Sequence, residues 1–448
     1  MKNLISFAVM LCTAALAGAQ TWTNVGAPGF SAGQADYVSM ALSPAGTPYV
    51  AYMDFAYANR TTVQKFDGTS WVTVGAPGFT PAEGVFNSIA IDKFGTPYVA
   101  FQNSFSGAAS VMKYNGSSWV NVGSPAVSGG ASLTTRIAID TTGTVYLTYE
   151  DCPNHCKASV QKFNGTSWAN IGGAGFSDSV ALYTYIALGN DGTPYVTYLD
   201  YSQSQKATVK KFDGSSWVTV GAPGFSGRPS YWSNIAIDPG GTPYVAYQDS
   251  VTGGANVMKF DGSSWVHVGA APFSPGNVWQ PSIALWGGTP YVVFADHASG
   301  HKTSVMKFDG SAWVNVGLPG LSADTAGMTC IAIDATGTIY VAYEDYGYGH
   351  KVVVKKFHSN VAVRDVPGVE PGIELSPNPG SGTFTFNIHS AQQEDVKVSV
   401  MNVLGKQVKE VEATTNTPTE MRLSIPAGIY LINARTANYS AVSRLIVN

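Results

Sequence analysis

The chain has 448 residues, of which 12% are charged and 12% aromatic, and it contains 49 glycines. Its formal net charge is −4, which argues against a nucleic acid or an acidic membrane as the partner. Few charges combined with many aromatics and glycines favour an exported β protein.

Residues 1–19 have the pattern of a secretory signal peptide. Lys2 supplies a positive start, residues 4–16 supply an apolar core, and residues 17–19 form a small-residue cleavage site before Gln20. The apolar run is shorter than the roughly 20 residues that a membrane-spanning helix needs, and no other stretch is a candidate span. We therefore predict an exported chain without a transmembrane segment.

Residues 20–357 repeat one sequence unit seven times. Its marker is a tryptophan that follows Ser, Thr or Ala and recurs every 48 or 49 residues. The seven markers are Trp22, Trp71, Trp119, Trp168, Trp217, Trp265 and Trp313. A period this constant indicates identical structural units, each one supersecondary element.

Each unit holds four short runs with β character, which in the second unit are residues 89–92, 97–101, 111–114 and 119–123. They are rich in Val, Ile, Tyr, Phe and Trp and are bounded by Gly, Asp, Asn and Ser. Tight turns such as Asn115-Gly116 join the first run to the second and the third to the fourth. The other connections are longer and differ between units. Because alternate connections of an antiparallel meander lie at the same edge, the variable loops should gather on one face.

Four-stranded units of about 40–50 residues arranged radially form a β-propeller. The first run has alanine at its centre in every unit, as expected where strands crowd toward an axis: Ala41, Ala90, Ala138, Ala187, Ala236, Ala284 and Ala332. The region opens with a lone fourth run at Trp22 and ends with a third run at Phe357, so the first strand should complete the last blade. We predict an all-β fold, a seven-bladed β-propeller in which three strands from one end and one from the other close the ring.

Three cysteines remain after Cys12 leaves with the signal peptide. Cys152 and Cys156 lie in the variable loop between the second and third runs of the third unit, which predicts a local disulfide in an oxidising compartment. A metal site that includes His155 is the alternative, but no fourth ligand is visible, so we predict neither a metal nor a cofactor. Cys330 enters an apolar run and should be a buried free thiol.

The repeat ends before residues 358–372, a polar segment with two prolines that we predict to be a linker. Residues 373–448 differ in kind: they hold Pro377-Asn378-Pro379, Gly405 after an apolar run, Gly428-Ile429-Tyr430, and the apolar end 445–447. In these four features the tail resembles the type A sorting domain of the type IX secretion system of Bacteroidota. The resemblance implies a small Ig-like β-sandwich that the outer-membrane translocon recognises, with the cargo then released or tethered to the cell surface. An ordinary Ig-like adhesion domain is the alternative.

The variable-loop face carries two sets of candidate ligand-binding residues. The second run of each unit ends in an acidic or amide residue: Asp54, Asn103, Asp151, Asp200, Asp249, Asp296 and Asp345. Five units place an aromatic residue just before the first run: Tyr37, Phe86, Tyr183, Trp232 and Trp279. Aromatic faces beside carboxylates suit sugar rings, which offer apolar C–H faces and hydroxyl donors. In the alternative, the aspartates cap turns and the aromatics wedge between blades.

Signs of catalysis are weaker. The propeller has only three glutamates, Glu83, Glu150 and Glu344, and three arginines, Arg60, Arg136 and Arg228, none in a distinctive motif. Histidines that could meet across the loop face are His155, His297, His301 and His350. We expect a non-enzymatic propeller, secreted or at the cell surface, that binds a glycan or another extracellular ligand such as a protein. A polysaccharide hydrolase or lyase and a structural or protein-docking module are the alternatives.

Overall fold

The computed structural model describes residues 21–357, 372–390, 393–402, 406–435 and 440–447. These residues form two compact units, one from 21–357 and one from 372–447. The expected signal peptide (1–19) and nearly all of the expected linker (358–372) lie outside the described residues and stay predictions. In the part of the chain that the structure describes, no helix is long and apolar enough to cross a membrane.

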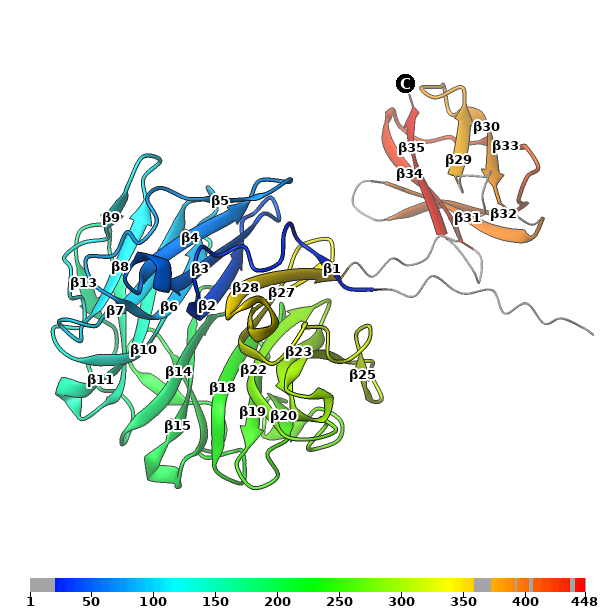
Figure 1. Cartoon of the computed structure of the whole chain (residues 1–448). Coiled ribbons are helices and arrows are strands. Elements are labelled where there is room, and N and C mark those ends of the chain that lie inside the picture. The colour runs from blue at the N-terminus through cyan, green and yellow to red at the C-terminus, as the bar shows by residue number, and fades with distance from the viewer. Residues whose placement is uncertain (1–20, 358–371, 391–392, 403–405, 436–439, 448) are drawn as a thin grey trace, which may run out of the picture. The chain divides into compact units, whose positions relative to one another are not determined.

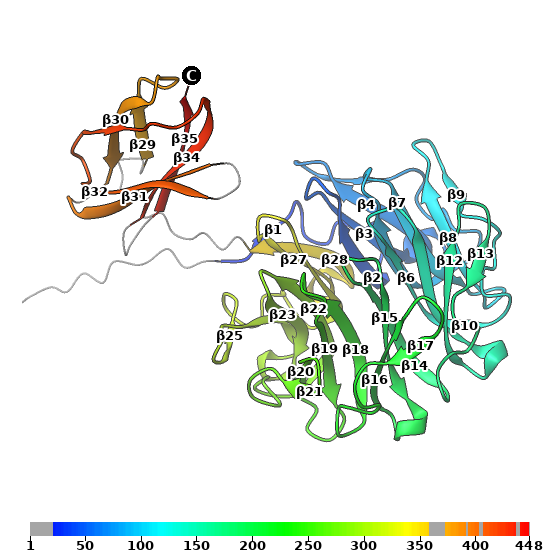
Figure 2. The same cartoon turned by 180° about the vertical axis from the view of Figure 1, so that it is seen from behind.

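The first unit consists of seven four-stranded antiparallel sheets that lie around a common centre (Figures 1 and 2). Each sheet is a blade, and the blades are numbered in chain order. The innermost strands of blades 1 to 7 are β2 (Ala35–Leu42), β6 (Gly84–Ile91), β10 (Ser132–Ile139), β14 (Ala181–Leu188), β18 (Ser230–Ile237), β22 (Val278–Trp286) and β26 (Ala326–Ile333). Each contacts the next around the ring, and β26 contacts β2. The predicted seven-bladed β-propeller is confirmed.

Three further strands complete each blade. The second strands are β3 (Pro48–Asp54), β7 (Pro97–Asn103), β11 (Val145–Asp151), β15 (Pro194–Asp200), β19 (Pro243–Asp249), β23 (Thr289–Asp296) and β27 (Ile339–Asp345). The third strands are β4 (Arg60–Phe66), β8 (Ala109–Tyr114), β12 (Lys157–Phe163), β16 (Lys206–Phe212), β20 (Ala255–Phe260), β24 (Lys302–Phe308) and β28 (Lys351–Phe357). The outermost strands are β5 (Trp71–Thr73), β9 (Trp119–Asn121), β13 (Trp168–Asn170), β17 (Trp217–Thr219), β21 (Trp265–His267), β25 (Trp313–Asn315) and, in blade 7, β1 (Thr23–Asn24).

The ring closes as the sequence predicts. Strand β1 pairs antiparallel with β28, with Thr23 opposite Lys356. The rings of Trp22 and Phe357 lie 5.2 Å apart between centroids. Blade 7 therefore takes three strands from the end of the repeat region and one from its start, and this shared blade closes the ring.

The repeat tryptophans join each blade to the one before it. Each indole Nε1 donates a hydrogen bond of 2.6–2.8 Å to a backbone carbonyl just beyond the outermost strand of the preceding blade, as Trp119 does to Val74 and Trp22 to Val316. The residue after that carbonyl is a glycine in the left-handed region: a Cβ on Gly75 (φ 71°) would lie 2.8 Å from the Tyr114 ring. The marker tryptophan thus packs between blades, which explains its strict period.

Short turns and long loops separate to opposite faces. Aspartates hold the short turns, as Asp67 does by accepting hydrogen bonds of 2.8 Å from the backbone N–H groups of Thr69 and Ser70. The loops between second and third strands form the other face. Five of them contain one turn of 3₁₀-helix: η1 (Phe55–Tyr57), η2 (Cys152–Asn154), η3 (Tyr201–Gln203), η4 (His297–Ser299) and η5 (Tyr346–Tyr348).

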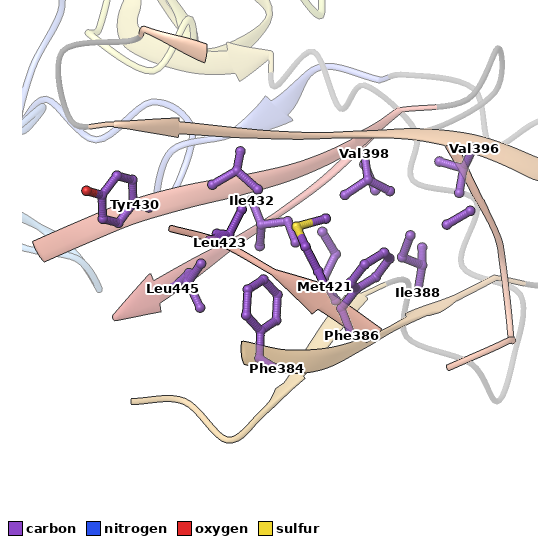
Figure 3. Close-up of a cluster of buried hydrophobic side chains, with 14 of the residues drawn as sticks. Phe384, Phe386, Ile388, Val396, Val398, Met421, Leu423, Tyr430, Ile432 and Leu445 are labelled. Carbon is purple, nitrogen blue, oxygen red and sulfur yellow. The ribbon is translucent and has the colours of Figure 1, made fainter. Parts of the chain in front are cut away.

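The second unit is a small β-sandwich. One sheet has the order β29-β30-β33 and the other β32-β31-β34-β35. The strands are β29 (Gly372–Ser376), β30 (Thr383–His389), β31 (Asp395–Asn402), β32 (Gln407–Thr414), β33 (Thr419–Arg422), β34 (Gly428–Arg435) and β35 (Ser440–Val447). Side chains from both sheets meet in one core, with Phe386 and Ile432 fully buried (Figure 3). Asn378 of the Pro-Asn-Pro motif accepts a hydrogen bond from Ile446 N at 2.8 Å and donates one to Arg444 O, so it fastens the last strand.

Candidate functional site

The acidic residues that end the second strands shape the loops. Four of them precede 3₁₀-helices and accept a hydrogen bond of 2.9–3.1 Å from the backbone N–H two residues on: Asp54, Asp200, Asp296 and Asp345. Asp249 and Asn103 each accept from two backbone N–H groups of a loop without a helix. Asp151 accepts from the side chains of Asn154 and Ser159. The six aspartates are buried, so we assign this ring to loop structure and leave it out of the candidate site.

Each innermost strand has a β-bulge near its start, and the residue at the bulge has a positive φ of 48–54°. These residues are Tyr37, Phe86, Thr134, Tyr183, Trp232, Gln280 and Met328. Four of the predicted aromatics therefore occupy equivalent positions, whereas Trp279 stands one residue earlier. The rings of Tyr37 and Phe86 lie 5.0 Å apart, and those of Tyr183 and Trp232 lie 6.3 Å apart.

Aromatic and acidic side chains converge in one pocket of about 550 Å³, which we call the mouth pocket. Its walls come from blades 1, 5, 6 and 7. Its aromatic and ionisable lining residues are Asp36, Phe55, Trp232, Trp279, Glu344, Tyr346 and His350. The pocket shares Trp232, Gln280 and Met328 with a smaller cavity in the central channel, which places it at the channel mouth. Of the predicted aromatics, Trp232 and Trp279 line it, and Tyr37, Phe86 and Tyr183 do not.

The two carboxyl groups of the mouth pocket hold protons more tightly than usual. Burial raises the pKa of Asp36, although its carboxylate accepts a 2.7 Å hydrogen bond from Tyr37 N. Burial also raises the pKa of Glu344; its hydrogen bond with His350 opposes that shift and the nearby charge of Asp36 adds to it. Glu344 Oε1 lies 2.7 Å from His350 Nδ1, and the His350 ring lies 3.8 Å from the Tyr346 ring.

Trp279 presents an indole that is 43% exposed. Two histidines contact it: the His297 ring meets it edge-on at 4.7 Å, and the His301 ring lies at 5.3 Å. The two imidazoles lie 4.0 Å from each other. Burial and the neighbouring His301 lower the pKa of His297, which favours a neutral ring packed against the indole. Trp279 is thus held by two histidines and still remains 43% exposed.

The remaining candidates for catalysis do not form one cluster, although Arg136 and Glu150 lie close enough for their charges to interact. Arg60 and Arg228 are exposed at separate blades, and Arg136 lines the central cavity. Glu83 accepts a hydrogen bond from Asn59 at an exposed site, and Glu150 is buried. A disulfide joins Cys152 to Cys156, and among the described residues no three His, Cys, Asp or Glu side chains cluster to hold a metal ion. Cys330 lies on the wall of the central cavity, where burial raises the pKa of its thiol to about 12.

The sequence interpretation missed Asp36, Tyr346 and His350 as members of one pocket, and it gave Glu344 no role. A signal was present in the repeat itself. The position before the bulge is apolar or aromatic in blades 2 to 6 (Val85, Leu133, Leu182, Tyr231 and Trp279) but holds Asp36 in blade 1 and Gly327 in blade 7. Those two blades are neighbours in the closed ring, and the pocket lies where the pattern breaks.

The fold and this site define a seven-bladed β-propeller with a pocket at one mouth of its central channel. Residues 374–448 match the family model described as "Secretion system C-terminal sorting domain". The tail is therefore a sorting domain, and it directs the protein by type IX secretion to the cell surface or beyond. Comparison with curated protein sequences finds no match.

Solved structures with a similar chain path share little sequence. Polysaccharide lyase Uly1 has a TM-score of 0.49 and 10% identity, covering 71% of this chain and 89% of its own. A lectin of Aleuria aurantia has a TM-score of 0.42 and 16% identity over 66% of this chain and 99% of its own. An α-L-arabinanase of Penicillium chrysogenum has a TM-score of 0.42 and 11% identity over 76% and 98%. These likenesses are too loose to assign an activity.

Proposed function

We propose that the protein is an exported glycan-binding propeller whose ligand site is the mouth pocket. The observation that carries the proposal is the meeting of the partly exposed Trp279, the ring of Trp232 and two carboxyl groups in one pocket. Aromatic faces pack against the C–H faces of a sugar ring, and carboxylates accept hydrogen bonds from its hydroxyls. The volume of about 550 Å³ lies within the usual range of small-molecule sites, about 300–1,000 Å³.

The charge of the pocket favours a neutral sugar. At neutral pH the carboxylates of Asp36 and Glu344 would repel the negative charge of a uronate or a sulfated sugar. The same carboxylates have lone pairs that can accept hydrogen bonds from the hydroxyl groups of a neutral sugar. Binding then takes place after export, when the sorting domain (373–448) has engaged the translocon. No catalytic step is needed for this role.

A pair of tryptophans on one strand provides the experiment. Trp279 and Trp286 lie near the two ends of β22 and are 43% and 41% exposed, but only Trp279 lines the mouth pocket. Trp279→Ala should abolish binding on an array of neutral glycans, because stacking on the indole is lost, and Trp286→Ala should leave it unchanged. Equal glycan binding by the two variants would show that the mouth pocket is not the binding site.

A polysaccharide hydrolase or lyase is the second candidate, because two carboxyl groups with raised pKa values share the pocket with an imidazole. A protonated Glu344 is suited to a general acid. If the protein is an enzyme, Glu344→Gln keeps glycan binding and loses release of reducing ends by orders of magnitude. For a binding protein, wild type and variant release none.

A further inference from the structure

A second cavity, in the central channel, carries a positive charge. Its volume is about 140 Å³, and all seven innermost strands contribute to its wall. Apart from Arg136, the lining side chains are polar but uncharged, aromatic or apolar. The position of Arg136 is held in the other blades by Ser39, Ser88, Tyr185, Asn234, Ser282 and Cys330, so Arg136 is the one cation of this ring.

The Arg136 guanidinium is poorly satisfied. It lies 5.4 Å from the centre of the Tyr185 ring, and its one described hydrogen bond goes from Nη1 to Thr135 O at 2.9 Å. A guanidinium has five N–H donors. Among the described residues no carboxylate lies within ion-pair distance of it. Burial lowers the pKa of Arg136, the direction expected for a cation removed from water.

Glu150 is the acidic residue whose charge acts on Arg136. Its Oε1, however, already accepts hydrogen bonds from Thr134 Oγ1 at 2.6 Å and Tyr183 N at 2.7 Å. The negative charge of Glu150 therefore partly balances the positive charge of Arg136, but no hydrogen bond joins the carboxylate to the N–H groups of the guanidinium. Arg136 is partly buried in the cavity wall, and a cation with so few partners there is costly unless a counter-ion completes it.

Further donors face the channel. The hydroxyl oxygens of Ser39 and Ser88 accept hydrogen bonds from Ile89 N and Ile137 N, which leaves both O–H groups free to donate. We propose that the central cavity is a binding site for one small monovalent anion, a halide or a short carboxylate, held by Arg136 and channel hydroxyls. Water takes roughly 30 Å³ per molecule, so the cavity holds such an anion with a few waters and excludes a sugar. This site is independent of glycan binding at the mouth pocket.

The test uses bromide as the probe, exchanged at constant ionic strength against gluconate, which is larger than the cavity. Bromide should raise the melting temperature of the wild type along a saturating curve, by about 3–5 °C at a hundredfold excess over Kd. Arg136→Met should remove this dependence and fold at least as well in gluconate, since a partly buried and unpaired charge is gone. Arg228→Met removes the same charge from an exposed loop and should keep the full bromide response.

Anomalous diffraction from bromide-soaked wild-type crystals locates bound bromide directly and requires no variant. A bromide peak beside Arg136 supports the proposal. A saturable melting shift that survives in Arg136→Met, or a channel without a bromide peak at saturating bromide, overturns it. If Arg136→Met does not fold, Arg136→Lys should keep a weakened response, and an unchanged response in that variant would also contradict the site.

Discussion

Blades 3 and 7 carry a glutamate at the same place, one residue before the aspartate that ends the second strand. Glu150 in blade 3 is 2% exposed and has its Oε1 occupied by Thr134 and Tyr183. Glu344 in blade 7 lines the mouth pocket and pairs with His350. The residue opposite on the innermost strand differs, because Leu133 faces Glu150 and Gly327 faces Glu344.

The comparison shows how a repeat scaffold can acquire a pocket. Burial raises the pKa of both glutamates, so the raised pKa comes from this position in the blade and not from the pocket. What differs is access: Gly327 and Glu344 both line the mouth pocket, and a Cβ on Gly327 would lie 3.0 Å from Glu344 Oε2. The pocket therefore arises where one blade lacks a side chain and its neighbour, blade 1, adds Asp36.

The largest expected difference concerns stability. Glu150→Ala leaves the backbone N–H of Tyr183 without its acceptor in a partly buried place, and we expect it to lower the free energy of unfolding by roughly 2–3 kcal/mol. Glu344→Ala removes a pairing with the half-exposed His350, which water can replace, and should lower it by less than about 1 kcal/mol. Urea denaturation of both variants measures the free energy of unfolding. An equal decrease in the two variants would contradict the proposed difference between Glu150 and Glu344.

The next effect is on binding. Gly327→Leu copies the blade 3 residue into blade 7 and fills the space beside Glu344. We expect Kd for a glycan that binds the wild type to rise at least about tenfold, or ~1.4 kcal/mol, with little change in stability. Calorimetric titration measures the change. Leu133→Gly is the matched control and should bind as the wild type does; an unaltered Kd in Gly327→Leu would contradict the pocket assignment.

The smallest effect is on the pH dependence of stability. Burial raises the pKa of Glu344, so the folded protein keeps this proton at pH values just above 4.5, where the unfolded chain has lost it. The folded state then binds more protons than the unfolded state, and stability falls as pH rises through that window. Glu344→Gln should flatten this part of the curve. Unfolding free energies from about pH 4 to about pH 7 measure it, and parallel curves would show that the folded-state pKa of Glu344 is not raised.

The sequence was sufficient for the ring but not for the pocket. The period of Trp22, Trp71 and the other markers predicts seven blades, and the lone first strand predicts the closure seen between β1 and β28. Trp232 and Trp279 were among the predicted aromatics and both line the mouth pocket. The predicted aspartates recur in six blades and accept hydrogen bonds within their own loops, as Asp54 and Asp200 do, so loop structure accounts for their regularity.

By itself the amino-acid sequence determined the blades, their number and the sorting tail, because each depends on patterns within about 50 residues or on a local motif. Only the tertiary structure decided which side chains meet. Asp36 and Glu344 stand near opposite ends of the repeat region and become neighbours when β1 completes blade 7. Arg136 becomes a channel charge for the same reason: closing the ring turns one position of each innermost strand toward a shared axis, where an unmatched residue faces six other blades.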